Sequence, residues 1–220
     1  DPAMFFYLRA AARYDLVRKM RASICVLGPL LAKRGQAQVA MPGGCAIGAR
    51  PVNLHLRGLR AMGAEIDLAG GDIVATSKRL KGAEIFLGGP FGSTVLGTAN
   101  IMMAACLAEG RTVIESAACE PEMQDLADCL NKMGAKITGA GTPRVTIEGV
   151  EKLHGCEHRV ISDRIEAGTF MIAAAVTNGE VTLENARMDH MMAVVDKLRE
   201  IGVRVDPDKD GLTVSSSRRL

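Results

Sequence analysis

The segment LRAMGA at residues 59–64 recurs in modified form as LNKMGA at 130–135 and LREIGV at 198–203. Each copy closes a stretch with helical periodicity, and its glycine suits the left-handed backbone that commonly follows a helix. Glycines at 35, 110 and 179 mark a second set of helix ends at similar intervals. Because this similarity returns about every seventy residues, the sequence predicts one supersecondary unit used several times.

Hydrophobic patterning within a repeat indicates which elements are inside. Residues 99–107 and 170–176 are apolar almost all round, which predicts helices buried on every side. Residues 112–115, 145–148 and 180–184 alternate between apolar and polar, which predicts strands with one face in water. A further strand is expected after the glycine of residues 80–83 and again after that of 153–156. Helices in the middle with sheets outside is therefore the predicted arrangement.

Bulk composition excludes several classes of protein. The chain has 220 residues, a net charge of +2, only 3% aromatic residues and no Trp, which argues against a base-stacking nucleic-acid surface. It shows no apolar run of about twenty residues and no signal peptide, so no membrane partner is expected. Six cysteines without a C-x-x-C pair indicate reduced thiols, and hence a cytoplasmic protein.

One loop is longer in the first repeat than in the others. Gly35 and Gly63 are 28 positions apart, whereas the corresponding glycines are 24 and 23 apart in the later repeats. The extra residues fall in MPGGCAIGARP at 41–51, which carries Cys45 and Arg50. A nearby guanidinium and a helix start favour a reactive thiolate. Equally, Cys45 fits an incidental loop cysteine between turn glycines, and the loop alone leaves both interpretations open.

Three other features have a functional and a structural interpretation. The segment GGPFGSTVLGT at 88–98 offers backbone N–H groups at a helix start, suited to a diphosphate, or is a plain connecting loop. Arg21 begins an apolar helix and is either paired structurally or faces a cleft. The alternating His154, Cys156 and His158 lack the spacing and further ligands of a metal site, so no metal is expected.

The remaining helical cysteines have a simpler interpretation. Cys25, Cys106 and Cys129 fall within apolar helical patterns. Free cysteine behaves as a small hydrophobic residue in such places. We expect these three to be core residues without a chemical role.

Several strings together resemble the UDP-N-acetylglucosamine 1-carboxyvinyltransferases, a family of enolpyruvyl transferases. They are YDLV at 14–17, MRAS at 20–23, PGGCAIGARPV at 42–52, NIMMAA at 100–105, ESAACEPE at 115–122 and DRIEAGTF at 163–170. The resemblance runs from about Tyr14 to Val205, and the cysteine loop is its most specific part. The sibling family that acts on shikimate 3-phosphate shares the fold but lacks this loop.

This resemblance implies an α/β enolpyruvyl-transferase fold turned inside out, with repeated βαβαββ units, buried helices and outer solvent-facing sheets. Residues 1–161 would supply two repeats of the first domain, and residues 162–220 the truncated opening repeat of the second. The implied reaction needs no cofactor. It transfers enolpyruvyl from phosphoenolpyruvate to the 3′-hydroxyl of UDP-N-acetylglucosamine and releases phosphate, the first committed step of peptidoglycan synthesis. Cell wall biogenesis, cell shape, cell division and the cell cycle are the implied processes.

The resemblance also implies residue roles. Cys45 matches the general acid that protonates phosphoenolpyruvate, can form a covalent adduct and is alkylated by fosfomycin. Arg50 matches an arginine that binds phosphoenolpyruvate, and Arg21 one that contacts the nucleotide sugar. Further substrate contacts are implied at Pro51, Val52, Asn53, Leu54, Ser93, Thr94, Val95, Leu96 and Gly97. Asn53 stands where the family usually has an aspartate.

Parts of the family pattern have no counterpart in these 220 residues, including most of the second domain. We therefore expect the isolated chain to be inactive, and the surfaces left open to favour self-association. A non-catalytic binding or assembly module derived from the family is the alternative, although the retained Cys45, Arg50 and Arg21 speak against it. A sibling transferase for another phosphorylated sugar or cyclitol is disfavoured by the cysteine loop.

Overall fold

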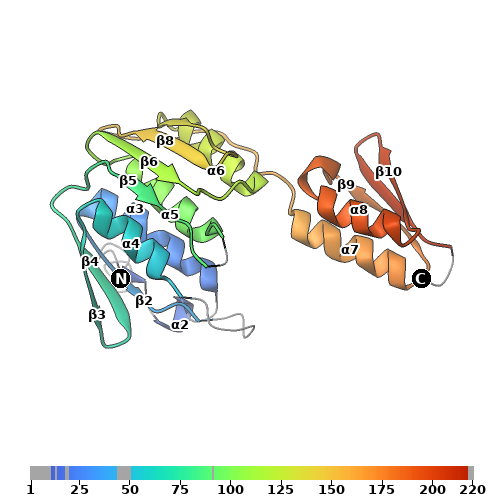
Figure 1. Cartoon of the computed structure of the whole chain (residues 1–220), viewed down its shortest axis with the longest axis horizontal. Helices are drawn as coiled ribbons and strands as arrows, with labels where there is room; N and C mark the ends of the chain where they lie inside the picture. Colours follow the sequence, from blue (N-terminus) through green and yellow to red (C-terminus); the bar gives the residue numbers. More distant parts are fainter. Residues whose placement is uncertain (1–10, 13, 18–19, 44–50, 91, 218–220) are drawn as a thin grey trace, which may run out of the picture. The chain divides into compact units, whose positions relative to one another are not determined.

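The computed structural model describes residues 11–12, 14–17, 20–43, 51–90 and 92–217. It divides into two compact units, Asp1–His158 and Arg159–Leu220, both traced in Figure 1. In the described part of the chain, no helix combines the length and the apolar character needed to cross a membrane.

Three repeats follow one another along the chain. The first contains β1 (Ala11–Ala12), α2 (Tyr14–Val17), η1 (Arg21–Val26), α3 (Leu27–Arg34), β2 (Gln36–Ala40), α4 (Asn53–Ala61), β3 (Glu65–Ala69) and β4 (Asp72–Thr76). The second contains β5 (Glu84–Phe86), α5 (Val95–Ala105), β6 (Arg111–Glu115), α6 (Pro121–Lys132), β7 (Lys136–Thr138) and β8 (Arg144–Glu148). The third contains α7 (Arg164–Val176), β9 (Glu180–Glu184), η2 (Met188–His190), α8 (Met192–Glu200), β10 (Arg204–Asp208) and β11 (Gly211–Ser215).

Sheet topology repeats with the sequence. The first two sheets have the orders β1-β2-β4-β3 and β5-β6-β8-β7, each with one parallel pair at the start and antiparallel pairs after it. The third sheet, β10-β11-β9, has the same antiparallel order without the parallel edge strand. The predicted βαβαββ unit is therefore confirmed, complete in the first two repeats and short of its opening strand in the third.

Backbone conformation at the repeat junctions also recurs. Ser116 after β6 and Asn185 after β9 occupy equivalent positions, and both have left-handed φ values, 56° and 59°. Five of the six predicted glycines have a left-handed backbone: Gly35, Gly63, Gly134 and Gly202 at helix ends, and Gly110 a few residues beyond the end of α5. Gly179 does not. There Asn178 takes the left-handed conformation instead, with φ 51°, because asparagine tolerates it better than most residues.

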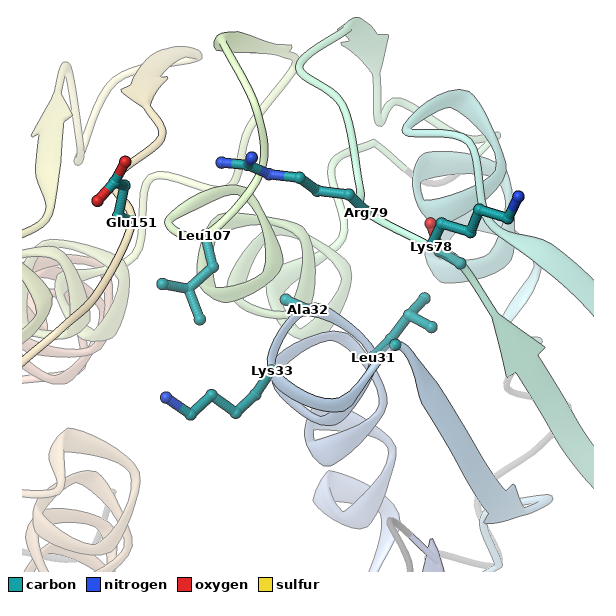
Figure 2. A pocket seen from close by; sticks show the side chains of 9 residues that line it. Leu31, Ala32, Lys33, Lys78, Arg79, Leu107 and Glu151 are labelled. Carbon is teal, nitrogen blue, oxygen red and sulfur yellow. The ribbon is translucent and has the colours of Figure 1, made fainter.

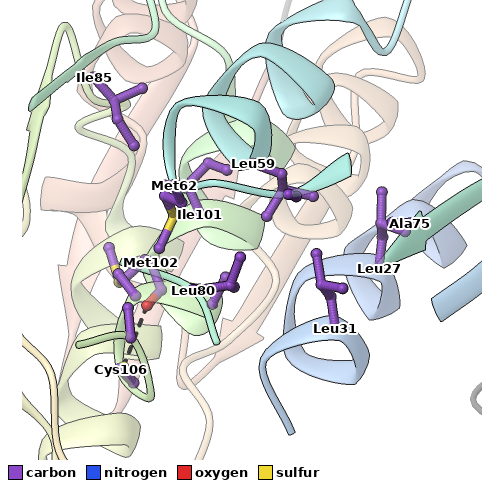
Figure 3. Close-up of a cluster of buried hydrophobic side chains, with 14 of the residues drawn as sticks. Leu27, Leu31, Leu59, Met62, Ala75, Leu80, Ile85, Ile101, Met102 and Cys106 are labelled. Carbon is purple, nitrogen blue, oxygen red and sulfur yellow. Dashed lines mark hydrogen bonds between the residues drawn. The ribbon is translucent and has the colours of Figure 1, made fainter. Parts of the chain in front are cut away.

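The core of the first unit is built around α5. This helix packs against η1, α3, α4 and α6, and most of its residues are buried all round. Figure 3 shows its Ile101 and Met102 among side chains from α3 and α4. Two glycines allow the close approach: a Cβ at Gly28 of α3 would lie 2.4 Å from the Asn100 carbonyl, and one at Gly58 of α4 would lie 2.6 Å from Ile101. The predicted buried helix is confirmed here.

The equivalent helix of the second unit differs from the prediction. Within its unit α7 packs against α8, β9 and β11, and buries Ala167, Met171 and Ala174. Phe170, Ile172 and Val176 on its other side are 50%, 50% and 70% exposed. The prediction of burial on every side was wrong for residues 170–176, because no other helix in the described residues 159–217 covers that side.

Two smaller predictions also fail. Residues 149–163 contain no strand; residues 154–158 among them run along α6, whose side chains offer no strand edge to pair with. In β6 the burial does not alternate strictly. Val113, on the outer face, is buried beside its strand neighbours Glu84 and Thr146. The alternation predicted for β8 is confirmed.

Candidate functional site

The residues predicted to act on substrate fall in two groups. Cys45 and Arg50 lie outside the described residues. The others lie at the start of η1, the start of α4, and the start of α5 with the loop before it. These three segments are brought together in the first unit, and their residues Arg21, Pro51–Leu54 and Thr94–Gly97 are called the Arg21 cluster below.

Contacts between η1 and α4 form one side of the Arg21 cluster. The Arg21 Nη2 donates to the Pro51 carbonyl at 3.4 Å, across 30 residues of sequence. Val52 is buried, and Asn53 is exposed at the first position of α4. Val52 is the N-cap residue of α4 and makes no side-chain capping hydrogen bond. Half-buried Leu54 reaches the neighbouring loop, since its Cδ1 lies 3.3 Å from where a Cβ on Gly89 would be.

The loop before α5 forms the other side. Gly89 and Gly92 exchange two backbone hydrogen bonds of 2.8 and 3.0 Å, which close the loop on itself. Ser93 is exposed, and Thr94 caps α5 by accepting a hydrogen bond from the Gly97 N–H at 3.2 Å.

The start of α5 is also tied to η1. The Leu96 carbonyl accepts a hydrogen bond from the Cys25 thiol at 3.8 Å. Val95 and Leu96 are half-buried, and Gly97 is buried. The loop before α5 is thus anchored at its closed turn, at its cap and against η1.

Electrostatics at this cluster favour a negatively charged ligand. The first turns of α4 and α5 present backbone N–H groups and the positive ends of two helix dipoles. The Arg21 guanidinium adds a full positive charge beside the start of α4. Helix starts combined with a guanidinium are well suited to phosphate or carboxylate groups.

A buried polar network behind the cluster was not predicted as part of the site. Asn100 of α5 accepts from the Gly28 N–H at 2.7 Å and donates to the Ile24 carbonyl at 3.0 Å. Its second N–H reaches His55 Nδ1 at 3.0 Å, which assigns the imidazole proton to Nε2. Asn100 thereby joins η1, α3 and α4, the same elements that position Arg21 and the start of α4.

His55 is held neutral by its surroundings. Burial, and next the positive charge of Arg21, together lower the pKa of His55 from 6.5 to about 4. A signal for this network exists in the sequence: Asn100 is a polar residue in an otherwise apolar helix, and a buried amide needs partners. The partner could not be read from the sequence, because His55 is 45 residues away.

None of the residues that line the cavity in Figure 2 belongs to the Arg21 cluster. The cavity has a volume of about 400 Å³ and is lined at the far end of α3 by residues that include Lys33, Lys78 and Arg79, none of them a predicted site residue. Lys33 belongs to the last turn of α3, where a positive charge complements the negative end of the helix dipole. Its charge therefore has a structural explanation.

The helical cysteines match the prediction unequally. Cys106 is fully buried, and burial raises the pKa of its thiol to about 12. Cys25 and Cys129 are only half-buried, because each lies at the edge of its helix packing; burial still raises the pKa of Cys25 to about 11. Among the described residues, no three His, Cys, Asp or Glu side chains are arranged to hold a metal ion.

Comparison with protein families identifies the class of protein. The EPSP synthase family, described as 3-phosphoshikimate 1-carboxyvinyltransferase, matches residues 7–219. The chain belongs to this family of enolpyruvyl transferases. The resemblance seen in the sequence is thereby confirmed at the level of the family.

Curated relatives give a narrower likeness. The chain is 57% identical over 213 residues to a UDP-N-acetylglucosamine 1-carboxyvinyltransferase of Methylacidiphilum infernorum, covering 97% of this chain and 51% of the relative. It is 56% identical over 209 residues to the protein of that name from Akkermansia muciniphila, covering 94% and 49%. The chain thus spans about half the length of the curated relatives that it matches.

Solved structures support the fold. The enolpyruvyl transferase NikO from Streptomyces tendae matches with a TM-score of 0.76 at 22% identity, covering 93% of this chain and 49% of that one. EPSP synthase from Acinetobacter baumannii matches with a TM-score of 0.64 at 24% identity, covering 89% and 46%. The predicted inside-out enolpyruvyl-transferase fold is confirmed.

Proposed function

We propose that the chain carries the sugar-nucleotide and cysteine-loop part of a UDP-N-acetylglucosamine 1-carboxyvinyltransferase. The whole protein would transfer enolpyruvyl from phosphoenolpyruvate to the 3′-hydroxyl of UDP-N-acetylglucosamine and release phosphate. The observation that carries this proposal is the 57% identity to a relative of that name across 97% of the chain. Peptidoglycan synthesis in the cytoplasm, with its links to cell shape, cell division and the cell cycle, follows as part of the same proposal.

Geometry at the Arg21 cluster supports a nucleotide-sugar site. A diphosphate carries negative charge that two helix starts and a guanidinium can stabilise together. Arg21 would contact the nucleotide sugar, with the starts of α4 and α5 holding its remaining polar groups. Asn53 is exposed at the start of α4 and, as an amide, can donate or accept hydrogen bonds there without adding a repelling charge.

Chemistry in the proposed reaction falls to two residues of the cysteine loop. Cys45 would protonate the methylene carbon of phosphoenolpyruvate, and Arg50 would bind its phosphate or carboxylate. Protonating a vinyl carbon requires a positioned acid, and a dianion is best held by bidentate guanidinium contacts. A tetrahedral adduct would then collapse by losing phosphate. Fosfomycin would alkylate Cys45.

The length of the chain bears on activity. Because it spans about half the length of its curated relatives, we propose that the chain alone binds nucleotide sugar but does not turn over phosphoenolpyruvate. The same fact supports the second candidate, a binding module that is completed by another chain. Reactivity at Cys45, which only the transferase candidate requires, separates these two candidates.

The test is fosfomycin labelling with and without UDP-N-acetylglucosamine, followed by intact mass and peptide mapping. We expect one adduct, at Cys45, formed several-fold faster with the nucleotide sugar present. Cys45→Ser should abolish labelling, and Cys119→Ser, which removes an exposed thiol elsewhere, should leave it unchanged. Labelling spread over several cysteines would contradict a specific site.

Arg21 has a matched control at the opposite end of the same helical segment. Arg21→Gln should weaken UDP-N-acetylglucosamine binding, measured by calorimetry, by about tenfold or more, which is the scale of one charge-assisted contact. Arg34→Gln removes an exposed arginine in the last turn of α3 and should leave binding unchanged. Equal effects of the two substitutions would mean that only net charge matters, which would overturn the assignment of Arg21.

A further inference from the structure

The segment that leads from the first unit to the second lies along α6. The His154 N–H donates to the Met133 carbonyl at 2.9 Å, just beyond the end of the helix. His158 Nε2 donates to Asp125 Oδ1 at 3.0 Å, two turns further back, with both side chains largely buried. Residues 154–158 are therefore fixed to α6 at both ends.

Between these anchors Cys156 faces Cys129. The Cys156 thiol donates to the Cys129 carbonyl at 3.7 Å, across 27 residues of sequence. Burial, and next a hydrogen bond with the Cys156 thiol, raise the pKa of Cys129. The Cys156 thiol therefore lies against the backbone of Cys129.

A match of spacings explains why the contacts fall in register. Two residues of extended chain advance by about 6.6 Å, and four residues of helix by about 6 Å. Residues 154, 156 and 158 can therefore meet residues 133, 129 and 125 in turn, running against the direction of α6. Because the three contacts are in register, the hydrogen bonds of His154 and His158 hold the Cys156 thiol over Cys129.

Charged groups around the two thiols come from both elements. On α6, Asp125 and Lys132 lie on the same face as Cys129, and act on its thiol in opposite directions. On the segment 154–158, called the linker, His158 accepts a hydrogen bond from the Lys132 Nζ at 3.3 Å through Nδ1 and donates to Asp125 through Nε2. Cys156 is exposed to small molecules in solvent, whereas Cys129 is half-buried.

We propose that Cys129 and Cys156 form a reversible disulfide, called the linker staple, when the chain meets a low-molecular-weight disulfide. This modification would fix the end of the first unit to α6 just before the second unit begins at Arg159. It is independent of the proposed transferase function, because none of its residues belongs to the Arg21 cluster.

The exchange takes place in two balanced steps. The exposed Cys156, as thiolate, attacks one sulfur of the small disulfide, forming a mixed disulfide and releasing one small thiol, which takes up the proton that Cys156 lost. Cys129 then loses its proton and attacks the Cys156 sulfur, releasing the second small thiol. The protein loses two hydrogen atoms and the small disulfide gains them. A small dithiol reverses both steps.

The test treats the reduced full chain with glutathione disulfide, followed by alkylation, intact mass and peptide mapping without reduction. We expect the loss of two hydrogen atoms and a cross-linked pair of peptides containing Cys129 and Cys156. Closing a 27-residue loop should also raise the midpoint of thermal unfolding by roughly 5–10 °C. Dithiothreitol should reverse both changes.

Single substitutions assign the two steps. Cys129→Ser should stop at a stable glutathione adduct on Cys156, because the resolving thiol is missing. Cys156→Ser should leave Cys129 mostly unmodified, because it is half-buried. Cys119→Ser and Cys45→Ser should both form the staple as the unaltered chain does, and the latter separates this result from the transferase proposal.

One further variant tests the anchoring. His158→Ala removes the contact with Asp125, so the staple should form several-fold more slowly while the Cys156 adduct forms at its usual rate. A glutathione adduct on Cys156 that accumulates in the unaltered chain, without the Cys129–Cys156 bond, would overturn the proposal. A bond between any other pair of cysteines would overturn it as well.

Discussion

Helices α5 and α7 occupy the same place in successive repeats but have different surroundings. Gly110 and Gly179 fix the offset between the repeats at 69 residues, which pairs Thr94 with Asp163, Asn100 with Thr169 and Ile101 with Phe170. Both helices are strongly apolar, and Met102 and its counterpart Met171 are both fully buried. Ile101 is also fully buried, whereas Phe170 is 50% exposed. Composition alone therefore does not decide how much of a helix is buried.

Neighbouring helices make the difference. The first unit has two repeats, so α5 also packs against α3 and α4 of the preceding repeat. In the second unit a single repeat supplies α8 and a sheet on one side of α7. An apolar helix of this fold is thus enclosed by its neighbour repeat as well as by its own. The polar residues follow the same rule: Asn100 is buried with three partners, while the exposed Thr169 hydroxyl bonds within its own helix to the Ile165 carbonyl.

The largest difference is expected between Ile101→Ala and Phe170→Ala. Ile101→Ala should lower the free energy of unfolding of the first unit by about 3–4 kcal/mol, through lost burial and the cavity left behind. Phe170→Ala removes more atoms but should cost the second unit only about 1 kcal/mol, since half of the ring is already in water.

Urea unfolding followed by circular dichroism suits this measurement, because the chain has no Trp. Met102→Ala and Met171→Ala form the matched control, and both should cost about 2–4 kcal/mol, since both side chains are fully buried. A cost for Phe170→Ala as large as that for Ile101→Ala would show that the outer side of α7 is covered in solution.

A second difference concerns pH. The pKa of His55 is about 4 in the folded chain against an ordinary value of 6.5, so between these values the unfolded chain binds a proton that the folded chain does not. Stability of the first unit should therefore fall as pH drops through this window, by about 3 kcal/mol for the full shift. Counted from Gly63 and Gly202, His55 corresponds to Val194, and Asn100 corresponds to Thr169, so the second unit lacks this contribution.

Unfolding free energies of the unaltered chain and His55→Asn at several pH values isolate this contribution. The asparagine keeps an acceptor for Asn100, so the variant should be less stable at pH 7.5 but lose less on acidification. Parallel curves for the two proteins would refute a buried neutral His55.

The sequence predicted the repeat and the inside-out arrangement from local patterns: helix-end glycines, apolar helices and alternating strands. The residues of the Arg21 cluster came from the resemblance to the family, and their roles stay predictions. Prediction from the sequence failed where the structure of a segment depends on which other segments pack against it. The same apolar pattern occurs at residues 99–107 and 170–176, but the two helices have different neighbours. Similarly, residues 153–156 resemble 80–83 but run along α6 instead of leading into a strand. The Asn100–His55 contact likewise depends on the packing of two helices.

The smallest difference is expected at the helix starts. Thr94 accepts one hydrogen bond, from the Gly97 N–H at 3.2 Å. Its counterpart Asp163 accepts two through Oδ1, from the Ile165 and Glu166 N–H groups at 2.8 and 3.1 Å, and adds a negative charge at the positive end of α7. Asp163→Ala should therefore cost about 1.5 kcal/mol and Thr94→Ala about 1 kcal/mol or less. Thr94→Ser and Asp163→Asn keep the acceptor and should cost only a few tenths, so urea unfolding of the four variants separates the hydrogen bonds from the charge. If Asp163→Asn cost as much as Asp163→Ala, the charge on α7 would matter more than its cap, and the two helix starts would differ in kind.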